Sequence, residues 1–368
     1  MIRKTLTIVK YAAMVIAGLA VVLLTSALLY RGYLQHRVAE RLSIRSRNGI
    51  DSLERVRVGG IDQWIEVRGQ NVNNPILLFI HGGPGIAFIP LANSFQAPWE
   101  KSFTVVEWDQ RGAGKTYASN DRDQQQRTMN VPQMEQDTLG VVNYLRNRFQ
   151  RKKIFVVGHS WGSVLGLWLA HEHPDLIYAY VGVGQLLDAK QNDVLAYQDA
   201  LQEASRTHNL QAIRDLEGIA PYPPPTLDDR KGGIARYWEE RLLGPPPSPG
   251  AFANPRRLLM DVVSAPQYSL ADDFGFIRGM SLSRETFSPQ LVSINLNQLG
   301  SEFSAPIFFF EGRQDPYCRP ALIWDYYQQI RAPEKDFIWF DNSGHFPFFE
   351  EQQKFTRELV QRLLPLAN

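Results

Sequence analysis

Short, nearly unbroken apolar runs recur along most of the chain and alternate with longer segments that have helical spacing. The runs that we interpret as strands cover residues 76–80, 103–107, 154–157, 178–183, 306–310 and 336–340. Continuous apolar strands are typical of a parallel sheet that helices cover on both faces. Helices are predicted near residues 132–149, 161–172, 320–331 and 348–364. This alternation predicts an α/β protein with a doubly wound, mostly parallel sheet.

Residues 186–300 do not continue the strand pattern. Helical segments, at residues 188–207 and 232–243, are interrupted there by proline clusters. The clusters are Pro221 with Pro223–Pro225, and Pro245–Pro247 with Pro249. Because the strand pattern resumes near residue 306, we interpret 186–300 as a helical cap inserted into one sheet domain. Insertions on a rigid scaffold often carry specificity, so the cap is expected to select the substrate.

The sheet domain is predicted to open with a β-hairpin. Residues 55–67 alternate between apolar and polar positions and carry Gly59 and Gly60 at their centre. This pattern is typical of two antiparallel strands joined by a tight turn. The core of the domain then comprises residues 53–185 and 301–368.

A long uncharged segment lies near the N-terminus. Residues 11–30 contain no charge and are bounded by Tyr11 and Tyr30. As a helix the segment would be about 30 Å long, the thickness of a bilayer's hydrocarbon core, and tyrosines suit the two interfaces. A cleaved signal peptide is the competing interpretation, but the run is long and residues 30–33 form a poor cleavage site. We predict a single-pass anchor between a basic segment, 1–10, and a polar juxtamembrane helix or stalk, 31–52.

Positive charge flanks the predicted span on both sides. Arg3, Lys4 and Lys10 precede it, and five arginines lie between residues 31 and 47. The positive-inside rule counts both flanks. The short basic N-terminus favours export of the globular domain, whereas the later arginines favour the cytoplasm. We predict the extracytoplasmic side.

The composition does not favour nucleic acid as a partner, and it does not identify the cellular compartment of the protein. The chain has 368 residues, 44% of them apolar and 21% charged, with a formal net charge of +1. This balance does not suggest nucleic acid as a partner. Cys318 is the single cysteine, so neither an intrachain disulfide nor a cysteine-based metal site can form.

The segment Gly158–Gly162 has the pattern G-x-S-x-G, with Ser160 at its centre. It follows an apolar run and precedes a helical segment, the context in which this pattern is typical of the nucleophile elbow of serine hydrolases. Glycines on either side let strand and helix approach closely and let the turn adopt unusual backbone angles. The pattern therefore predicts that Ser160 is a nucleophile.

A serine nucleophile needs a base, and the base needs an acid that orients it. Among seven histidines, His345 directly follows a predicted strand near the C-terminus. Asp315 follows the preceding predicted strand. The order serine, aspartate, histidine along the chain is the one expected of α/β-hydrolases. We therefore predict that His345 is the base and Asp315 the acid.

The glycine-rich segment His81–Gly85 follows an early strand. Such a turn exposes backbone N–H groups, which could bind the oxyanion that forms during acyl transfer. We predict that the N–H groups of Gly83 and Trp161 are the two donors. An ordinary tight turn is the alternative interpretation of the segment.

Together these motifs resemble the proline iminopeptidase group of α/β-hydrolases. The resemblance is carried by His81–Gly85, Asp109–Gly114 and Gly158–Ser163 and covers roughly residues 55–185 and 300–365. It implies an α/β-hydrolase fold and the triad Ser160, Asp315 and His345. We expect no metal or organic cofactor, because the sequence shows no cluster of ligands and the chemistry needs none. The resemblance also implies that Asp109–Gly112 is a structural turn beside the site.

The same resemblance bears on the substrate. Related aminopeptidases hold the free amine of a peptide with cap carboxylates, in a pattern Trp-x-x-Trp-Glu. Here Ala235 replaces the first tryptophan, while Trp238 and Glu239 remain as candidate substrate-binding residues. We expect an aminopeptidase that acts on short peptides. The alternatives are a hydrolase of small or lipophilic esters, lactones or amides, and a catalytically silent binding protein.

Overall fold

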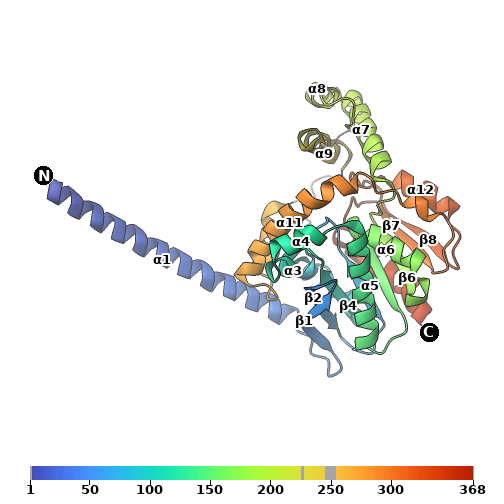
Figure 1. The fold of residues 1–368 in the computed structure, drawn as a ribbon, viewed down its shortest axis with the longest axis horizontal. Coiled ribbons are helices and arrows are strands. Elements are labelled where there is room, and N and C mark those ends of the chain that lie inside the picture. Colours follow the sequence, from blue (N-terminus) through green and yellow to red (C-terminus); the bar gives the residue numbers. More distant parts are fainter. Residues whose placement is uncertain (1, 225–227, 245–253, 368) are drawn as a thin grey trace.

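A mostly parallel sheet forms the centre of the molecule (Figure 1). The computed structural model describes residues 2–224, 228–244 and 254–367. The sheet of the described residues has eight strands in the order β1-β2-β4-β3-β5-β6-β7-β8. They are β1 (Ile50–Val58), β2 (Ile61–Gly69), β3 (Ile76–Ile80), β4 (Thr104–Asp109), β5 (Ile154–His159), β6 (Ile177–Val183), β7 (Ile307–Gly312) and β8 (Lys335–Phe340). The pairs β1–β2 and β2–β4 are antiparallel and all others are parallel, which confirms the predicted fold class.

Helices cover both faces of the sheet because the central strands are apolar on both faces. On one face, Leu78 and Val156 pack in a cluster with α5 (Val131–Arg148), α6 (Trp161–Glu172) and α12 (Pro320–Gln329). On the other, Leu77 and Phe155 pack with α2 (Ile89–Ala92), α14 (Gln352–Leu363) and neighbouring segments. Alternate residues of one strand thus belong to different cores, as the pleat requires.

Several further helices are short or lie in connections. They are α3 (Gly114–Ala118), α4 (Arg122–Thr128), α13 (Pro347–Glu350) and the 3-10 turns η1 (Trp99–Lys101), η2 (Pro174–Leu176), η3 (Leu296–Leu299) and η4 (Leu364–Ala367). The helix expected at 348–364 is therefore two helices, α13 and α14. The elbow helix α6 has the predicted bounds.

The region expected to be a cap divides into two parts. Three helices, α7 (Ala189–Arg206), α8 (Leu210–Glu217) and α9 (Asp229–Leu243), share a small apolar cluster and project from the body (Figure 1). In contrast, α10 (Pro255–Val263) and α11 (Leu270–Leu291) pack on the sheet domain, where Val262 and Phe276 are buried. A Cβ added to Gly275 or Gly279 would lie about 2.6 Å from a backbone oxygen near α3, so these glycines permit the close packing of α11. Pro225 and the second proline cluster lie outside the described residues.

The N-terminal helix α1 (Ile2–Arg41) extends far from the body (Figure 1). It is the one helix of the described residues that is long and apolar enough to cross a membrane, and its apolar window is unburied. The helix continues beyond the apolar segment, and its last turns dock on the body. Arg31 Nη2 lies 2.9 Å from Asp273 Oδ2 and donates to the Tyr268 carbonyl at 2.9 Å. Gln35 Nε2 donates to the Ala265 carbonyl at 2.7 Å. Residues 31–52 were expected to form a juxtamembrane helix or stalk. Residues 31–41 are the docked end of α1, and β1 begins at Ile50.

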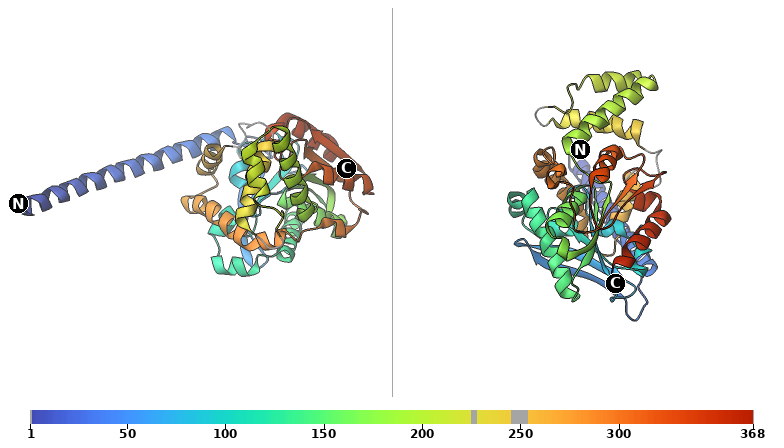
Figure 2. Two further views of the ribbon diagram at one scale, coloured as in Figure 1. Left: turned by 90° about the horizontal axis from the view of Figure 1, so that it is seen from above. Right: turned by 90° about the vertical axis from the view of Figure 1, so that its right-hand side faces the viewer.

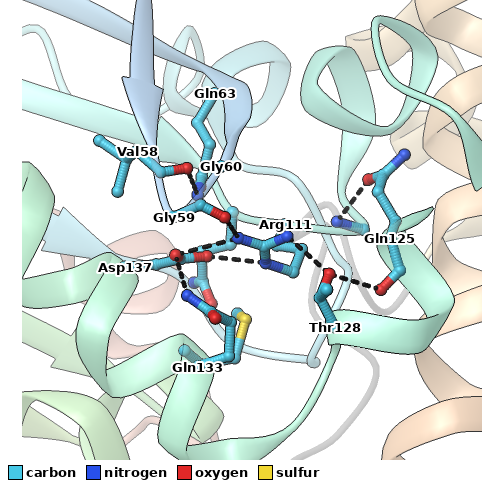
Figure 3. A network of polar contacts seen from close by, with 12 residues as sticks. Val58, Gly59, Gly60, Gln63, Arg111, Gln125, Thr128, Gln133 and Asp137 are labelled. Carbon is cyan, nitrogen blue, oxygen red and sulfur yellow. Dashed lines mark hydrogen bonds and ion pairs between the residues drawn. The ribbon is translucent and has the colours of Figure 1, made fainter.

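A buried ion pair fastens the loop after β4 to the hairpin and α5 (Figure 3). Arg111 Nε and Nη2 lie 2.8 and 3.1 Å from the two carboxylate oxygens of Asp137, and neither side chain is exposed. Arg111 also donates to Thr128 Oγ1 and to the Gly59 carbonyl, each at 2.8 Å. The guanidinium therefore joins the hairpin, α4 and α5 to the loop after β4.

Replacing Asp137 with alanine should lower the free energy of unfolding by about 3–5 kcal/mol, because it leaves the charge of Arg111 buried without its partner. Denaturant unfolding of both proteins in one detergent measures the change. Glu203→Ala is the control, since the Glu203–Arg206 pair lies on the surface and should matter little. Equal stability of the two variants would contradict the structural role of the buried pair.

Candidate active site

Ser160 lies at the sharp turn between β5 and α6, with backbone angles φ 54° and ψ −119°. A residue with a side chain rarely adopts a positive φ, so the turn is strained. Gly158 and Gly162, on either side of the turn, have no room for a side chain. A Cβ on Gly158 would lie 2.5 Å from the Gly162 carbonyl oxygen, and one on Gly162 would lie 2.0 Å from the Ile80 carbonyl oxygen. The local geometry is that of a nucleophile elbow, with Ser160 partly exposed at its tip.

Asp315 and His345 meet at the ends of two neighbouring strands. Asp315 follows β7, His345 follows β8, and Asp315 Oδ2 lies 2.7 Å from His345 Nδ1. The other oxygen, Oδ1, accepts the backbone N–H groups of Tyr317 at 2.7 Å and Cys318 at 2.9 Å. These bonds hold the carboxylate in one orientation, and the buried pair fixes the imidazole with Nδ1–H toward Asp315. Nε2 is then the nitrogen left to accept a proton.

Strand β6 lies between β5, which leads to Ser160, and β7, which leads to Asp315. The serine and the Asp315–His345 pair therefore lie at the same edge of the sheet. The N–H of Ser160 donates to the carbonyl of Val183, the last residue of β6, at 3.0 Å. The next residue, Gly184, has φ 51°, and a Cβ there would lie 2.8 Å from His345 Nδ1 and 3.2 Å from Asp315 Oδ2. Serine, aspartate and histidine therefore gather around Gly184 at the carboxyl ends of β5, β7 and β8.

The loop after β3 lies directly against the elbow. A Cβ on Gly82 would lie 2.9 Å from Ser160 Cβ, so the loop can approach only because this residue is glycine. Trp161 is the first residue of α6, and its N–H therefore has no partner inside the helix. The structure thus places the two predicted oxyanion donors, Gly83 and Trp161, in segments that adjoin Ser160.

Gln110 joins these two segments. Its side-chain oxygen accepts the indole N–H of Trp161 at 3.1 Å, and its Nε2 donates to the His81 carbonyl at 2.9 Å. The side-chain amide of Gln110 therefore holds the glycine loop and the elbow helix in a fixed relative position. This contact gives a positioning role to the turn that follows β4.

His159 is a positioning residue that the sequence pattern does not reveal, since any residue can occupy the position before the elbow serine. Its Nε2 lies 2.9 Å from the carbonyl oxygen of His345, and its ring is buried among phenylalanines. Burial lowers the pKa of His159 well below its ordinary value, and the neighbouring His345 adds to this shift. A neutral His159 can donate its Nε2–H to the His345 carbonyl and hold the backbone of that residue in place.

The structure separates the two candidate substrate-binding residues of the cap. Trp238 is buried in the cluster of α7–α9, and its indole N–H donates to Asp215 Oδ2 at 3.1 Å. These contacts of Trp238 lie within the cap. Glu239 is buried as well, and its Oε2 lies 3.4 Å from Arg236 Nη1. The guanidinium of Arg236 lies 5.0 Å from the Tyr317 ring centre, and the Tyr317 ring lies 4.9 Å from that of His345.

Two acidic residues of α9 therefore adjoin the loop after β7: Glu239 through Arg236, whose guanidinium lies over the Tyr317 ring, and Glu240, whose carboxylate acts directly on Tyr317. Burial raises the pKa of Glu239 to about 7, although Arg236 acts in the opposite direction. Asp193 of α7 also raises it, and burial raises the pKa of Asp193 itself. Arg319 also lowers the pKa of Glu239 and Glu240 raises it, so three acids and two arginines share this cluster. Among the described residues, no group of three or more potential metal ligands occurs.

The fold and the elbow define the class of this protein. A family model described as alpha/beta hydrolase fold matches residues 75–352, and the chain belongs to this family. It is a hydrolase and is similar to proline iminopeptidases. A probable aminopeptidase of Bacillus subtilis (strain 168), YbaC, is 29% identical over 86% of this chain and 97% of its own length.

Two further proteins support this relationship. A probable proline iminopeptidase of Leptolyngbya boryana is 26% identical over 75% of this chain and 82% of its own. The crystal structure of proline iminopeptidase from Mycobacterium smegmatis superposes with a TM-score of 0.62 at 18% identity and covers 86% of this chain and 99% of the other. At this identity the structural likeness concerns the fold.

Proposed function

We propose that the chain is a membrane-anchored serine hydrolase that removes the N-terminal residue of short peptides. The observation that carries the proposal is the buried Asp315–His345 pair, which gathers with the elbow serine around Gly184. Similarity to proteins named as aminopeptidases and proline iminopeptidases favours peptides as the substrates.

The proposed chemistry proceeds through an acyl-enzyme. His345 Nε2 takes the proton of Ser160 Oγ as this oxygen attacks the carbonyl carbon of the substrate. The N–H groups of Gly83 and Trp161 stabilise the oxyanion, and Asp315 stabilises the imidazolium. His345 then protonates the leaving amine as the scissile bond breaks. Water, deprotonated by His345, attacks the acyl-enzyme and releases the free acid and Ser160.

Glu239 is the proposed partner of the substrate's α-amine. In the ionised form it would accept a charge-assisted hydrogen bond from the ammonium group. A second candidate function is hydrolysis of small or lipophilic esters, lactones or amides. The contact of Arg236 with Glu239 favours this second function, because the carboxylate already has a cationic neighbour.

The proposed location is a membrane. Residues 11–30 of α1 would cross the bilayer and the hydrolase domain would lie on the extracytoplasmic side. The length, apolar surface and lack of burial of this helix support a span.

Wild type and Glu239→Gln should differ on an amine substrate and agree on an ester. The assay compares kcat/KM for proline p-nitroanilide with that for p-nitrophenyl butyrate. Loss of one charge-assisted bond, worth about 1.5–3 kcal/mol, should reduce the anilide value by roughly 10- to 150-fold. N-acetylation of the anilide should abolish its turnover, and Glu217→Gln, at an exposed glutamate of α8, is the matched control.

The aminopeptidase proposal also predicts how the preference for the anilide over the ester changes with pH. Because the pKa of Glu239 is raised to about 7, this residue is neutral below that pH and charged above it. The ratio of the anilide to the ester kcat/KM should therefore rise as the pH increases through about 7, since ionisation of the triad affects both substrates and cancels. In Glu239→Gln the ratio should be flat over this range. Turnover of the ester alone by the wild type would reject the aminopeptidase in favour of the second function.

A further inference from the structure

An exposed apolar surface lies on α10 and the first turns of α11. It consists of Leu259, Met260, Leu270, Phe274 and Ile277, and we refer to it as the α10–α11 patch. Phe274 is 62% exposed and Ile277 59%. Outside α1, only four other large apolar side chains of the described residues are exposed, and they are scattered over the molecule: Leu210, Tyr237, Val292 and Trp324. The patch is therefore a concentration of apolar surface, which usually marks an interaction site.

The exposed stripe of α11 changes character along the helix. Leu270, Phe274 and Ile277 are spaced by four and three residues and therefore line one side. The same stripe continues with the exposed polar residues Ser281 and Arg284. The opposite side of α11 is buried along both halves, so packing against the body does not explain the difference. Only the first half of the outer face is suited to an apolar environment.

The apolar half of α11 is the half next to α1. The carboxylate of Asp273 binds Arg31, the first residue after the uncharged segment, and Phe274 is the next residue along the chain. Gln35 and Arg31 also bind the Tyr268 carbonyl, just before α11 begins. In Figure 2, α10 and α11 lie on the side of the body from which α1 departs. The patch thus lies close to the depth at which α1 would leave a bilayer.

Basic residues border the patch. Arg256 and Arg257 begin α10, and Arg278 follows Ile277 on α11; all three side chains are exposed. Apolar side chains with a basic rim are typical of surfaces that rest in the headgroup region, where arginine meets lipid phosphates. This composition favours a lipid surface over a second protein as the occupant of the patch.

We infer that the α10–α11 patch inserts into the membrane interface beside α1 and forms a second point of membrane attachment. This inference rests on the proposed membrane span of α1. With two attachments, the body cannot turn about the axis of α1. The helix α11 then lies with its apolar half in the interface and its polar half in water.

Spin labels on the full-length chain in vesicles of phosphatidylcholine and phosphatidylglycerol can test the inference. Single cysteines replace Leu23 in the span, Phe274 in the patch, and Val292 at the far end of α11, about 27 Å along the helix from Phe274. The native Cys318 is buried and should not label. Collisions with oxygen, which concentrates in lipid, are compared with collisions with a water-soluble nickel chelate.

Labels at positions 23 and 274 should collide mainly with oxygen, and the label at 292 mainly with nickel. If 23 is in lipid while 274 behaves like 292, the second attachment is rejected and the span stands. Low collision rates with both reagents at 274 would mean that protein covers the patch, which also overturns the inference. If 23 itself is in water, the span fails and the inference fails with it.

Discussion

Ser160→Ala should abolish hydrolysis of every substrate, with a fall in kcat of about 10⁶-fold. The side chain at the tip of the elbow is the proposed source of the acyl-enzyme. The variant should also lose covalent labelling by a fluorophosphonate, which reacts with activated serines. Initial rates and labelling of the purified protein measure the two effects, with the exposed Ser281→Ala as the control.

A double variant sharpens this prediction. If Ser160 and His345 act as a unit, His345→Ala should cost about as much as Ser160→Ala, and the two together should cost little more. Additive losses would mean that they contribute separately, and the triad would have to be revised. Full labelling of Ser160→Ala by the fluorophosphonate would place the nucleophile elsewhere.

Gly184→Ala should lower kcat by roughly 10²- to 10⁴-fold while the protein stays folded. The added Cβ would lie 2.8 Å from His345 Nδ1, closer than real Cβ atoms approach, and 3.2 Å from Asp315 Oδ2, a tight contact. The pair must then separate, and an imidazole that loses its orienting aspartate loses up to about 10⁴-fold in kcat. KM should change little, because Gly184 supports the base and does not bind substrate.

Gly300→Ala is the matched control for backbone strain. Gly300 also has a positive φ, of 78°, but a Cβ there would meet no atom within 4 Å. Both variants pay for an unfavourable backbone angle, and only Gly184→Ala crowds the catalytic pair. Thermal stability should therefore fall in both variants, whereas activity should fall only in Gly184→Ala. Equal activity of the two variants would contradict the proposed crowding.

The strands and the elbow could be predicted because their physical cause is local. A strand covered on both faces must be apolar throughout, and the run at residues 76–80 coincides with β3. The elbow needs small residues beside Ser160, which makes its pattern visible in five residues. Asp315 and His345 could be proposed from their positions after strands, since parallel strands bring their carboxyl ends to one edge.

The parts that could not be predicted depend on contacts between distant segments. Gly184 supports the Asp315–His345 pair only after four strands have assembled, and nothing in its neighbourhood along the chain indicates this. His159 occupies a position that the elbow pattern leaves free. The direction of Trp238 depends on the packing of α7, α8 and α9, and a helical pattern does not show which side faces the site.

The bounds of the cap could not be predicted for the same reason. Proline-rich helical segments look alike whether they project from the body or pack on it. The two glycines that let α11 approach α3, Gly275 and Gly279, are unremarkable in sequence, because glycine in a helix has several explanations. Only the close approach of the two backbones identifies their role.

The docking of α1 has a consequence for how the enzyme would encounter its substrates. A flexible tether of about 20 residues would let an active site range over roughly 25 Å around its anchor. Here α1 runs directly into contacts with Tyr268 and Asp273, so no flexible tether separates it from the body. Under the proposed membrane placement, the enzyme would move laterally with the bilayer while its height above the lipid stayed constant. Turnover would then depend on how substrate distributes near the membrane surface, and a substrate that partitions toward lipid would be met far more often than its bulk concentration suggests.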